Sequence, residues 1–191
     1  MGGITGAVGC GLSDTYRQNT YQTIEDYGYE HGRDLDVLNF DNAVGQRQRA
    51  IDYYAHRVRG YTVDFKYDAI ANGATRGEYV DGKIAIYDEA FKAPNDGWNF
   101  DDVTGMMSTV DHEHNHLVNN AKWIAEAKKH GYDGLFKEPW MPGKAYVEAR
   151  NYQLGLEQGR AYGYSPNIMR CYQTQLKKMP WVIQADIGFL Y

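Results

Sequence analysis

The spacing of hydrophobic and polar positions changes several times along the chain, and each change predicts an element. From Asn42 to Gly60, apolar residues recur at helical spacing among arginine, glutamine and aspartate side chains. This pattern predicts an amphipathic helix of about four turns. Residues 62–70 then alternate between apolar and charged side chains, which predicts a strand that is buried on one face.

A hairpin and three helices are predicted further along the chain. Asp81-Gly82 separates two β-rich runs, residues 78–80 and 83–87, and is a strong hairpin signal. Helical spacing then covers residues 102–130, 144–162 and 166–178. This order of elements predicts an α+β domain, in which a small mixed sheet with its hairpin packs on the first of these helices and further C-terminal helices follow.

The beginning of the chain differs from the rest. Residues 1–40 start glycine-rich, and tyrosines then alternate with glycine, asparagine and acidic residues without a sustained period. We expect these residues to form an irregular Gly/Tyr-rich arm or linker. Residues 41–191 are expected to form the domain.

Composition excludes several classes of function. A net charge of -5 without a basic patch gives no reason to expect a nucleic-acid partner. No stretch is long and apolar enough to span a membrane, and the N-terminus lacks the basic and apolar regions of a signal peptide. Two cysteines, Cys10 and Cys171, are too few for a disulfide framework, and one long-range bridge or two free thiols are equally compatible with them.

The predicted helix at residues 102–130 contains the run with the most reactive side chains in the chain, His112-Glu113-His114-Asn115-His116. Its H-E-x-x-H spacing places two imidazoles one turn apart on a helix face, with a glutamate beside them. These are the minimum components of a zinc hydrolase.

The helical phase of the motif separates its histidines. His112 and His116 project away from an apolar stripe, whereas His114 points toward the stripe and is expected to be structural. The stripe contains Val103, Met107, Val110, Leu117, Ala121 and Ile124, flanked by Met106, Val118 and Ala125. The small or polar residues Gly105, Ser108, Thr109 and Asn119 share the histidine face, and we expect them to leave room beside the imidazoles.

Catalytic zinc needs a third protein ligand, with the fourth position left for water. One known solution, a third histidine six residues after the second, is excluded because Lys122 occupies that position. A glutamate from a later helix is the other solution, and Glu148 is the best candidate, with Glu157 in reserve. Glu148 shares a helix face with Gly155 and Gly159, and two glycines on one face suggest that another backbone approaches there.

These residues have distinct expected roles. Zinc held by His112, His116 and Glu148 would lower the pKa of its water toward about 7 and polarise a carbonyl group. Glu113, near the metal but not bound to it, would act as the general base and pass the proton to the leaving amine.

Other residues are expected to assist this chemistry. Tyr152 is a candidate donor to the oxyanion, and Tyr162 and Tyr164 are alternatives, although a packing role for Tyr152 is as compatible with the pattern. Asn119 is expected to orient an imidazole. Residues 84–87, if they form the sheet edge beside the cleft, are expected to pair with an extended peptide.

The motif, the strand at residues 83–87 and the segment 148–153 together resemble the zincin metallopeptidases of the glutamate-ligand, or gluzincin-like, type. The resemblance implies a zincin-like metallopeptidase domain, a zinc ion and a peptide or protein substrate. The small size and glycine-rich start also resemble the metallopeptidase toxin domains of bacterial polymorphic or RHS-type secreted proteins. That likeness implies secretion, or delivery as part of a larger polypeptide. His114 departs from the family, which more often has an aliphatic residue there.

Two other functions fit the same residues. One is a non-enzymatic secreted binding module in which a metal only stabilises the fold, and a closed fourth ligand would favour it. The other is a zinc amidase that acts on the cell wall.

Overall fold

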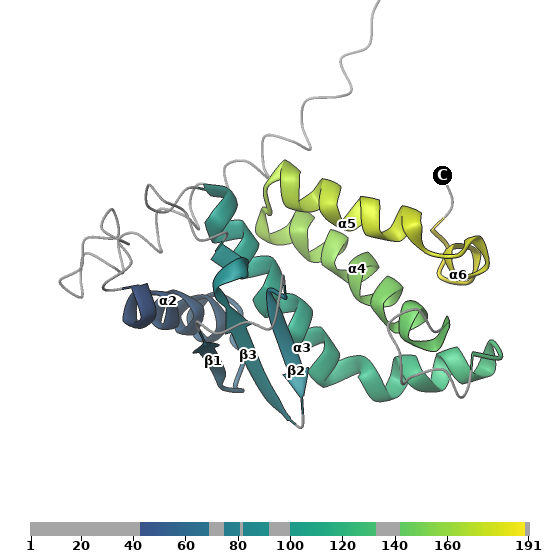
Figure 1. Ribbon diagram of the computed structural model, residues 1–191, viewed down its shortest axis with the longest axis horizontal. Helices are drawn as coiled ribbons and strands as arrows, with labels where there is room; N and C mark the ends of the chain where they lie inside the picture. Colours follow the sequence, from purple (N-terminus) through teal and green to yellow (C-terminus); the bar gives the residue numbers. More distant parts are fainter. Residues whose placement is uncertain (1–42, 69–74, 81, 92–99, 133–141, 190–191) are drawn as a thin grey trace, which may run out of the picture.

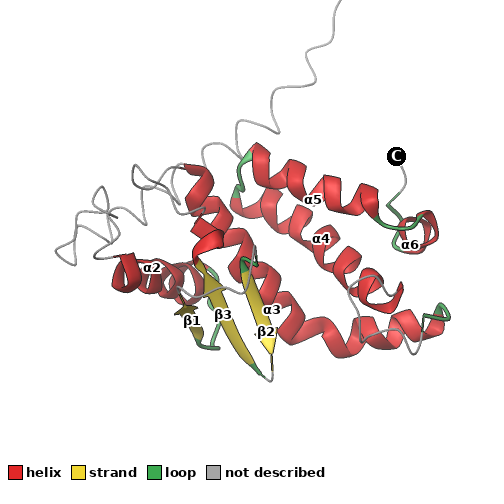
Figure 2. Ribbon diagram, in the orientation of Figure 1, coloured by secondary structure: helices red, strands yellow, loops and turns green. Residues whose placement is uncertain are grey.

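The computed structural model describes residues 43–68, 75–80, 82–91, 100–132 and 142–189. Its elements in chain order are α2 (Ala43–Asp52), η3 (Tyr53–Val58), β1 (Phe65–Asp68), β2 (Gly77–Val80), β3 (Lys83–Tyr87), η4 (Asp88–Phe91), α3 (Phe100–Lys129), α4 (Pro142–Tyr162), α5 (Pro166–Lys178) and α6 (Trp181–Asp186). The fold is mostly helical with a small three-stranded sheet (Figure 2), in agreement with the α+β prediction. The predicted arm, which includes Cys10, lies outside the described residues.

The first predicted helix is present but changes its winding. An α-helical part, α2, leads directly into the six-residue π-helix η3, which buries Tyr54 and Ala55. Gly60 follows with a φ of 69°, a conformation that glycine adopts without the steric cost paid by other residues. The helix therefore stops where the sequence predicts, and β1 begins five residues later.

The sheet has the order β1-β3-β2. The predicted hairpin is confirmed, because β2 pairs antiparallel with β3 and Gly82 adopts a φ of 78° in the turn. β1 pairs in parallel with the other side of β3, with Phe65 opposite Ile84. The expectation that residues 84–87 form the sheet edge is therefore wrong, because β3 is central and β2 is the edge strand.

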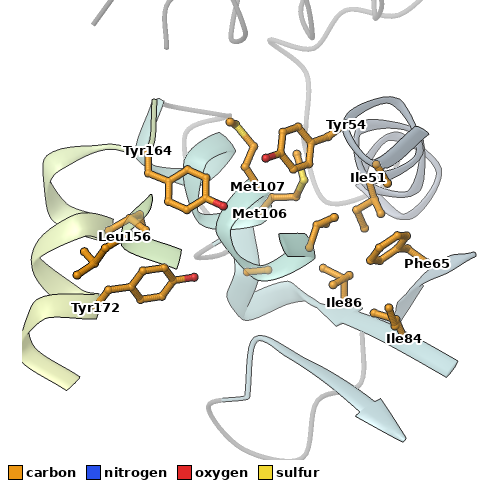
Figure 3. Packing of buried hydrophobic residues seen from close by; sticks show 14 of the residues in the cluster. Ile51, Tyr54, Phe65, Ile84, Ile86, Met106, Met107, Leu156, Tyr164 and Tyr172 are labelled. Atoms are coloured by element: carbon orange, nitrogen blue, oxygen red, sulfur yellow. The ribbon is translucent and has the colours of Figure 1, made fainter. Parts of the chain in front are cut away.

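The long helix α3 lies between the sheet and the helices α4 and α5 (Figure 1). It runs without a break through Asn119 and Asn120. Side chains from both sides meet around its first half: Met106 and Met107 lie between Tyr54 on one side and Tyr164 on the other (Figure 3). This double cover makes α3 the structural centre of the domain.

The predicted apolar stripe of α3 is correct only in the first half of the helix. Met106, Met107 and Val110 are buried, but Val118 is 57% exposed, and Ala121 and Ala125 are also exposed. Instead, Trp123 and Ala127 are buried. The buried face rotates because the sheet packs on the first part of α3, whereas α4 continues along the later part (Figure 1).

The C-terminal helices complete the core. Ser165 caps α5 by accepting a hydrogen bond from the Ile168 backbone N–H, and Pro166 occupies the first helical position, both of which favour a helix start. Gln153 of α4 donates to the Ile187 carbonyl just after α6. No helix of the described residues has the length and apolar character needed to cross a membrane.

Candidate metal centre

Side chains from α3 and α4 bring three ligand atoms together beside β2. His112 Nε2 lies 3.2 Å from His116 Nε2 and 3.4 Å from Glu148 Oε2. His116 Nε2 lies 3.5 Å from Glu148 Oε1. The structure therefore brings the three predicted ligands to one point, whereas the reserve candidate Glu157 is exposed more than two turns further along α4.

The spacing of these atoms suits a zinc ion. Ligand atoms around tetrahedral zinc, with bonds of about 2.0–2.1 Å, stand roughly 3.3–3.4 Å apart. The three separations of 3.2, 3.4 and 3.5 Å bracket this value. Among the described residues, no fourth histidine, cysteine or carboxylate joins the group. Three nitrogen and oxygen ligands with an open fourth position are typical of catalytic rather than structural zinc.

A neighbouring amide sets the tautomer of one imidazole. His116 Nδ1 lies 2.8 Å from Asn120 Oδ1, so the ring donates its Nδ1 proton and keeps the Nε2 lone pair for a metal. This is the role expected for Asn119, and that prediction is wrong by one position. Residues at i+3 and i+4 both border His116 on the helix surface, so the spacing alone does not choose between Asn119 and Asn120.

The charges of the three ligand residues are coupled in the absence of metal. Burial alone would raise the pKa of Glu148, but hydrogen bonds and attraction from His112 and His116 outweigh it, and the pKa lies well below the ordinary 4.5. Burial lowers the pKa of His116, yet the contacts with Glu148 and Asn120 raise it above the ordinary 6.5. The site therefore has a negative carboxylate that attracts positive charge.

Glu113 is held beside this group without joining it. The residue is 6% exposed and lines the cleft, and the described residues provide no hydrogen bond or ion pair to its carboxylate. Burial raises its pKa above the ordinary 4.5, and Glu148 and Glu78 add to this effect while the two imidazoles oppose it. A carboxylate with a raised pKa that faces a cleft is suited to proton transfer.

A glycine on the edge strand accommodates Glu113, and the sequence patterns did not single it out. A Cβ atom on Gly77 would stand 2.8 Å from Thr109 Cγ2 and 3.0 Å from Glu113 Cγ. Cβ atoms in proteins hardly ever come this close to other atoms. β2 can therefore approach α3 this closely only because residue 77 is glycine. Gly105 allows a similar approach, because its Cβ would stand 2.7 Å from the Ala90 carbonyl oxygen.

The glycines of α4 have a different partner from the one expected. A Cβ on Gly155 would overlap the Tyr172 ring, and one on Gly159 would overlap Met169 Sδ and stand 2.8 Å from the Tyr164 ring. Side chains of α5 and of the turn before it, rather than a backbone, therefore occupy this face. The expectation of a close backbone is wrong, although the glycines do mark a crowded contact. Ser108 and Thr109 are buried, and both line the cleft beside His112, in agreement with the expectation that they leave room there.

Tyr152 lies beside the three candidate metal ligands, whereas its two alternatives do not. Its ring centroid is 5.4 Å from that of His112, and burial together with Glu148 raises its pKa, so the hydroxyl stays protonated. Tyr164 is buried and donates to Asp111, and Tyr162 stacks under the Arg59 guanidinium at 3.7 Å.

A buried ionic cluster supports α3 next to the motif. Asp111 is 1% exposed and accepts hydrogen bonds from the hydroxyls of Tyr54, Tyr61 and Tyr164 and from Arg59 Nε. Burial raises the pKa of all three tyrosines, and Asp111 raises it further, so they remain donors. This cluster joins η3 and the residues after it, α3 directly before His112, and the turn between α4 and α5.

His114 belongs to the packing on the same side. Its ring stacks on Tyr61 with a centroid separation of 3.5 Å and an interplanar angle of 7°. Burial lowers its pKa, which favours the neutral ring. This placement agrees with the structural role expected for His114.

A ladder of amide side chains sets the register of α4 on α3. Asn151 donates to the His112 carbonyl and accepts from Asn115, both at 3.0 Å. Asn115 and Gln158 exchange two further bonds, at 2.9 and 3.0 Å. No sequence pattern predicts a role for these three residues, although the Asn115–Asn151–Gln158 ladder holds Glu148 opposite the imidazoles.

The three candidate ligands His112, His116 and Glu148 lie in a cleft with two lobes that share Gly77, His112 and Glu113. The first lobe, of about 540 Å³, is lined by β2, by His116 and Glu148 and by the apolar side chains of Ile124 and Val147. The second lobe, of about 320 Å³, lies between α3 and α5 and contains Arg76, Tyr152, Tyr172 and Gln175. Cys171, at the rim of the second lobe, is a free thiol, and any bridge to Cys10 lies outside the described residues.

The chain was compared with protein-family models, with curated proteins and with solved structures, and none of the three comparisons finds a match. The geometry of the site is therefore the basis for assigning a function.

Proposed function

We propose that this protein is a zinc-dependent metallopeptidase with a zincin-like domain of the glutamate-ligand type. The observation that carries the proposal is the mutual spacing of His112 Nε2, His116 Nε2 and a Glu148 oxygen at 3.2–3.5 Å in an open cleft. Delivery as part of a larger polypeptide, as in bacterial toxin domains, remains a prediction from the sequence.

Each residue of the site would have a definite task in peptide hydrolysis. Zinc held by His112, His116 and Glu148 would supply a water of lowered pKa and polarise the scissile carbonyl. Glu113, which has no partner among the described residues, takes a proton from the attacking water and returns it to the leaving amine. Tyr152 donates its hydroxyl proton in a hydrogen bond to the developing oxyanion.

The edge strand β2 offers a binding surface for an extended substrate. Among the described residues, β2 pairs with β3 on one side and with no strand on the other, and it lines the first lobe through residues 77–80. A peptide that adds to this edge would form backbone hydrogen bonds and lie across the metal group. The apolar side chains of Ile124 and Val147 would contact its side chains.

The observations favour this function over a non-enzymatic binding module. A binding module with a structural metal needs a closed coordination shell, whereas the described residues contribute three ligands beside a cleft of about 540 Å³. A cell-wall amide is a different substrate for the same chemistry, and peptidoglycan fragments belong in the same assay.

The proposal is tested by measuring zinc content and peptide cleavage together. Wild type should bind one zinc ion and cleave unstructured peptides. Glu113→Gln should keep zinc but lose about 100-fold or more in rate, because it removes the general base. Glu148→Gln should lose most of its zinc.

Glu157→Gln is the matched control, since it makes the same change on an exposed face of the same helix and should alter neither quantity. A protein that cannot be loaded with zinc would refute the proposal. Unchanged activity in Glu113→Gln would show that another residue is the base.

A further inference from the structure

The second lobe of the cleft contains one strongly basic side chain. Among the described residues that line it, Arg76 is the only lysine or arginine and Glu113 is the only carboxylate. The chain as a whole carries a net charge of -5, and Glu78, Glu113 and Glu148 line the neighbouring lobe. A positive side chain in these surroundings favours a ligand that brings a negative group into the lobe.

The backbone holds Arg76 in position at the end of the hairpin. Its carbonyl accepts a hydrogen bond from the Tyr87 N–H at 2.8 Å, and Gly77 beside it packs on Glu113. Its Nη1 atom reaches α3, where it lies 4.0 Å from the place that a Cβ on Gly105 would take. The guanidinium is therefore presented at the wall of the lobe, on the same face of α3 as the motif.

The described residues provide no hydrogen bond or ion pair to this guanidinium, which is half-buried. A guanidinium has five donors in a planar fork that matches a carboxylate. Partial burial strengthens such a pair, because less water competes for the donors. The group is thus placed to receive a carboxylate from a ligand.

We propose that Arg76 determines substrate specificity by binding a carboxylate of the peptide in the second lobe. The carboxylate is either an acidic side chain or the free C-terminus, since the guanidinium recognises the same group in both. This inference rests on the proposed peptidase function, because it assumes that a peptide crosses the cleft at Glu113.

The helix limits how far this carboxylate lies from the scissile bond. Gly105 and Glu113 are eight residues apart on α3, which corresponds to about 12 Å along the helix axis. An extended peptide advances about 3.3 Å per residue, so roughly four residues cover that distance. The carboxylate therefore belongs to one of the four residues nearest the scissile bond on the side of the second lobe.

The test uses one neutral peptide in three forms. The first has an amidated C-terminus and no acidic residue, the second ends in a free carboxylate, and the third is amidated but carries one glutamate at each position in turn. The dissociation constant is measured by calorimetry on zinc-loaded Glu113→Gln, and kcat/KM is measured on wild type. We expect one carboxylate form to bind and react about 10-fold or more better than the neutral amide, as charge-assisted hydrogen bonds predict.

Variants of Arg76 test whether this residue causes the preference for the carboxylate peptide. Arg76→Gln should bind the carboxylate and neutral peptides alike, and Arg76→Lys should keep part of the preference. Arg57→Gln makes the same change at an exposed arginine of η3 and should keep the whole preference. A preference for the free acid identifies the C-terminus as the source, whereas a preference for one glutamate position identifies a side chain.

The outcomes separate this inference from the proposed function. If wild type cleaves no peptide but the carboxylate form still binds better through Arg76, the peptidase proposal fails and the carboxylate site stands. If wild type cleaves all forms equally, or Arg76→Gln keeps the preference, the carboxylate site is overturned and the peptidase proposal stands. If no form binds, both are overturned.

Discussion

The amide ladder between α3 and α4 allows a stringent test, because Asn151 is hydrogen-bonded to the candidate ligand His112, whereas Gln158 has no hydrogen bond to the three candidate ligands. Asn151 is fully buried, donates to the His112 carbonyl and accepts from Asn115, both at 3.0 Å. Asn151→Ala removes two neutral hydrogen bonds, worth about 1 kcal/mol each. It also leaves a small cavity and an amide N–H of Asn115 without its acceptor. We therefore expect a loss of about 2–4 kcal/mol in the free energy of unfolding.

The same substitution should weaken zinc binding. Without the bond to the His112 carbonyl, α4 is free to shift on α3, and Glu148 moves away from the imidazoles. Loss of such supporting contacts costs about 10- to 100-fold in metal affinity. Urea unfolding of the metal-free protein measures the stability, and competition with a chromogenic chelator measures the zinc affinity.

Gln158→Ala separates the two effects. Gln158 exchanges bonds of 2.9 and 3.0 Å with Asn115, so its loss also weakens the contact between the two helices. It has no hydrogen bond to His112, and we expect its zinc affinity to fall much less than that of Asn151→Ala. Equal losses of zinc affinity in the two variants, or none in Asn151→Ala, would refute the positioning role of Asn151.

Further predictions concern the ionic groups on both sides of the motif. Asp111→Asn leaves the Arg59 charge buried without its counter-ion and should lower the free energy of unfolding by about 3–5 kcal/mol in urea titrations. In the metal-free protein, the lowered pKa of Glu148 stabilises the fold above pH 4.5, and the raised pKa of His116 stabilises it below pH 6.5. The melting temperature should therefore fall between pH 6 and pH 8.5, and less steeply in Glu148→Gln; equal slopes would contradict the coupling. His114→Phe preserves the stack on a neighbouring ring and should keep zinc affinity, measured by chelator competition, within about twofold of wild type; a larger loss would mean that His114 contributes to the site.

Local features of the site were predictable from the chain because a helix repeats every 3.6 residues. That period alone places His112 and His116 on one face and separates them from His114. It also places Glu148 and Tyr152 on one face of α4. Gly155 and Gly159 lie on that same face, and side chains rather than a backbone fill the space beside them.

Errors arose where one element meets another. Asn120, not Asn119, contacts His116, because the orientation of a side chain within a turn depends on its neighbours. The predicted apolar stripe of α3 is wrong beyond Leu117, because the elements that cover the helix change along its length. Arg59 and Asp111 are 52 positions apart, and no local pattern predicts that they pair.

The sequence alone determined the hairpin and the phase of the H-E-x-x-H helix, since both depend on contacts between residues close in the chain. Tertiary structure decided the order of the strands and the distance between Glu148 and the imidazoles. β1 takes the free side of β3, which makes β2 the edge beside the cleft, and the Asn115–Asn151–Gln158 ladder sets the register of α4 on α3. These outcomes depend on which elements, far apart in the sequence, pack against each other. The spacing of residues along the chain does not determine that packing.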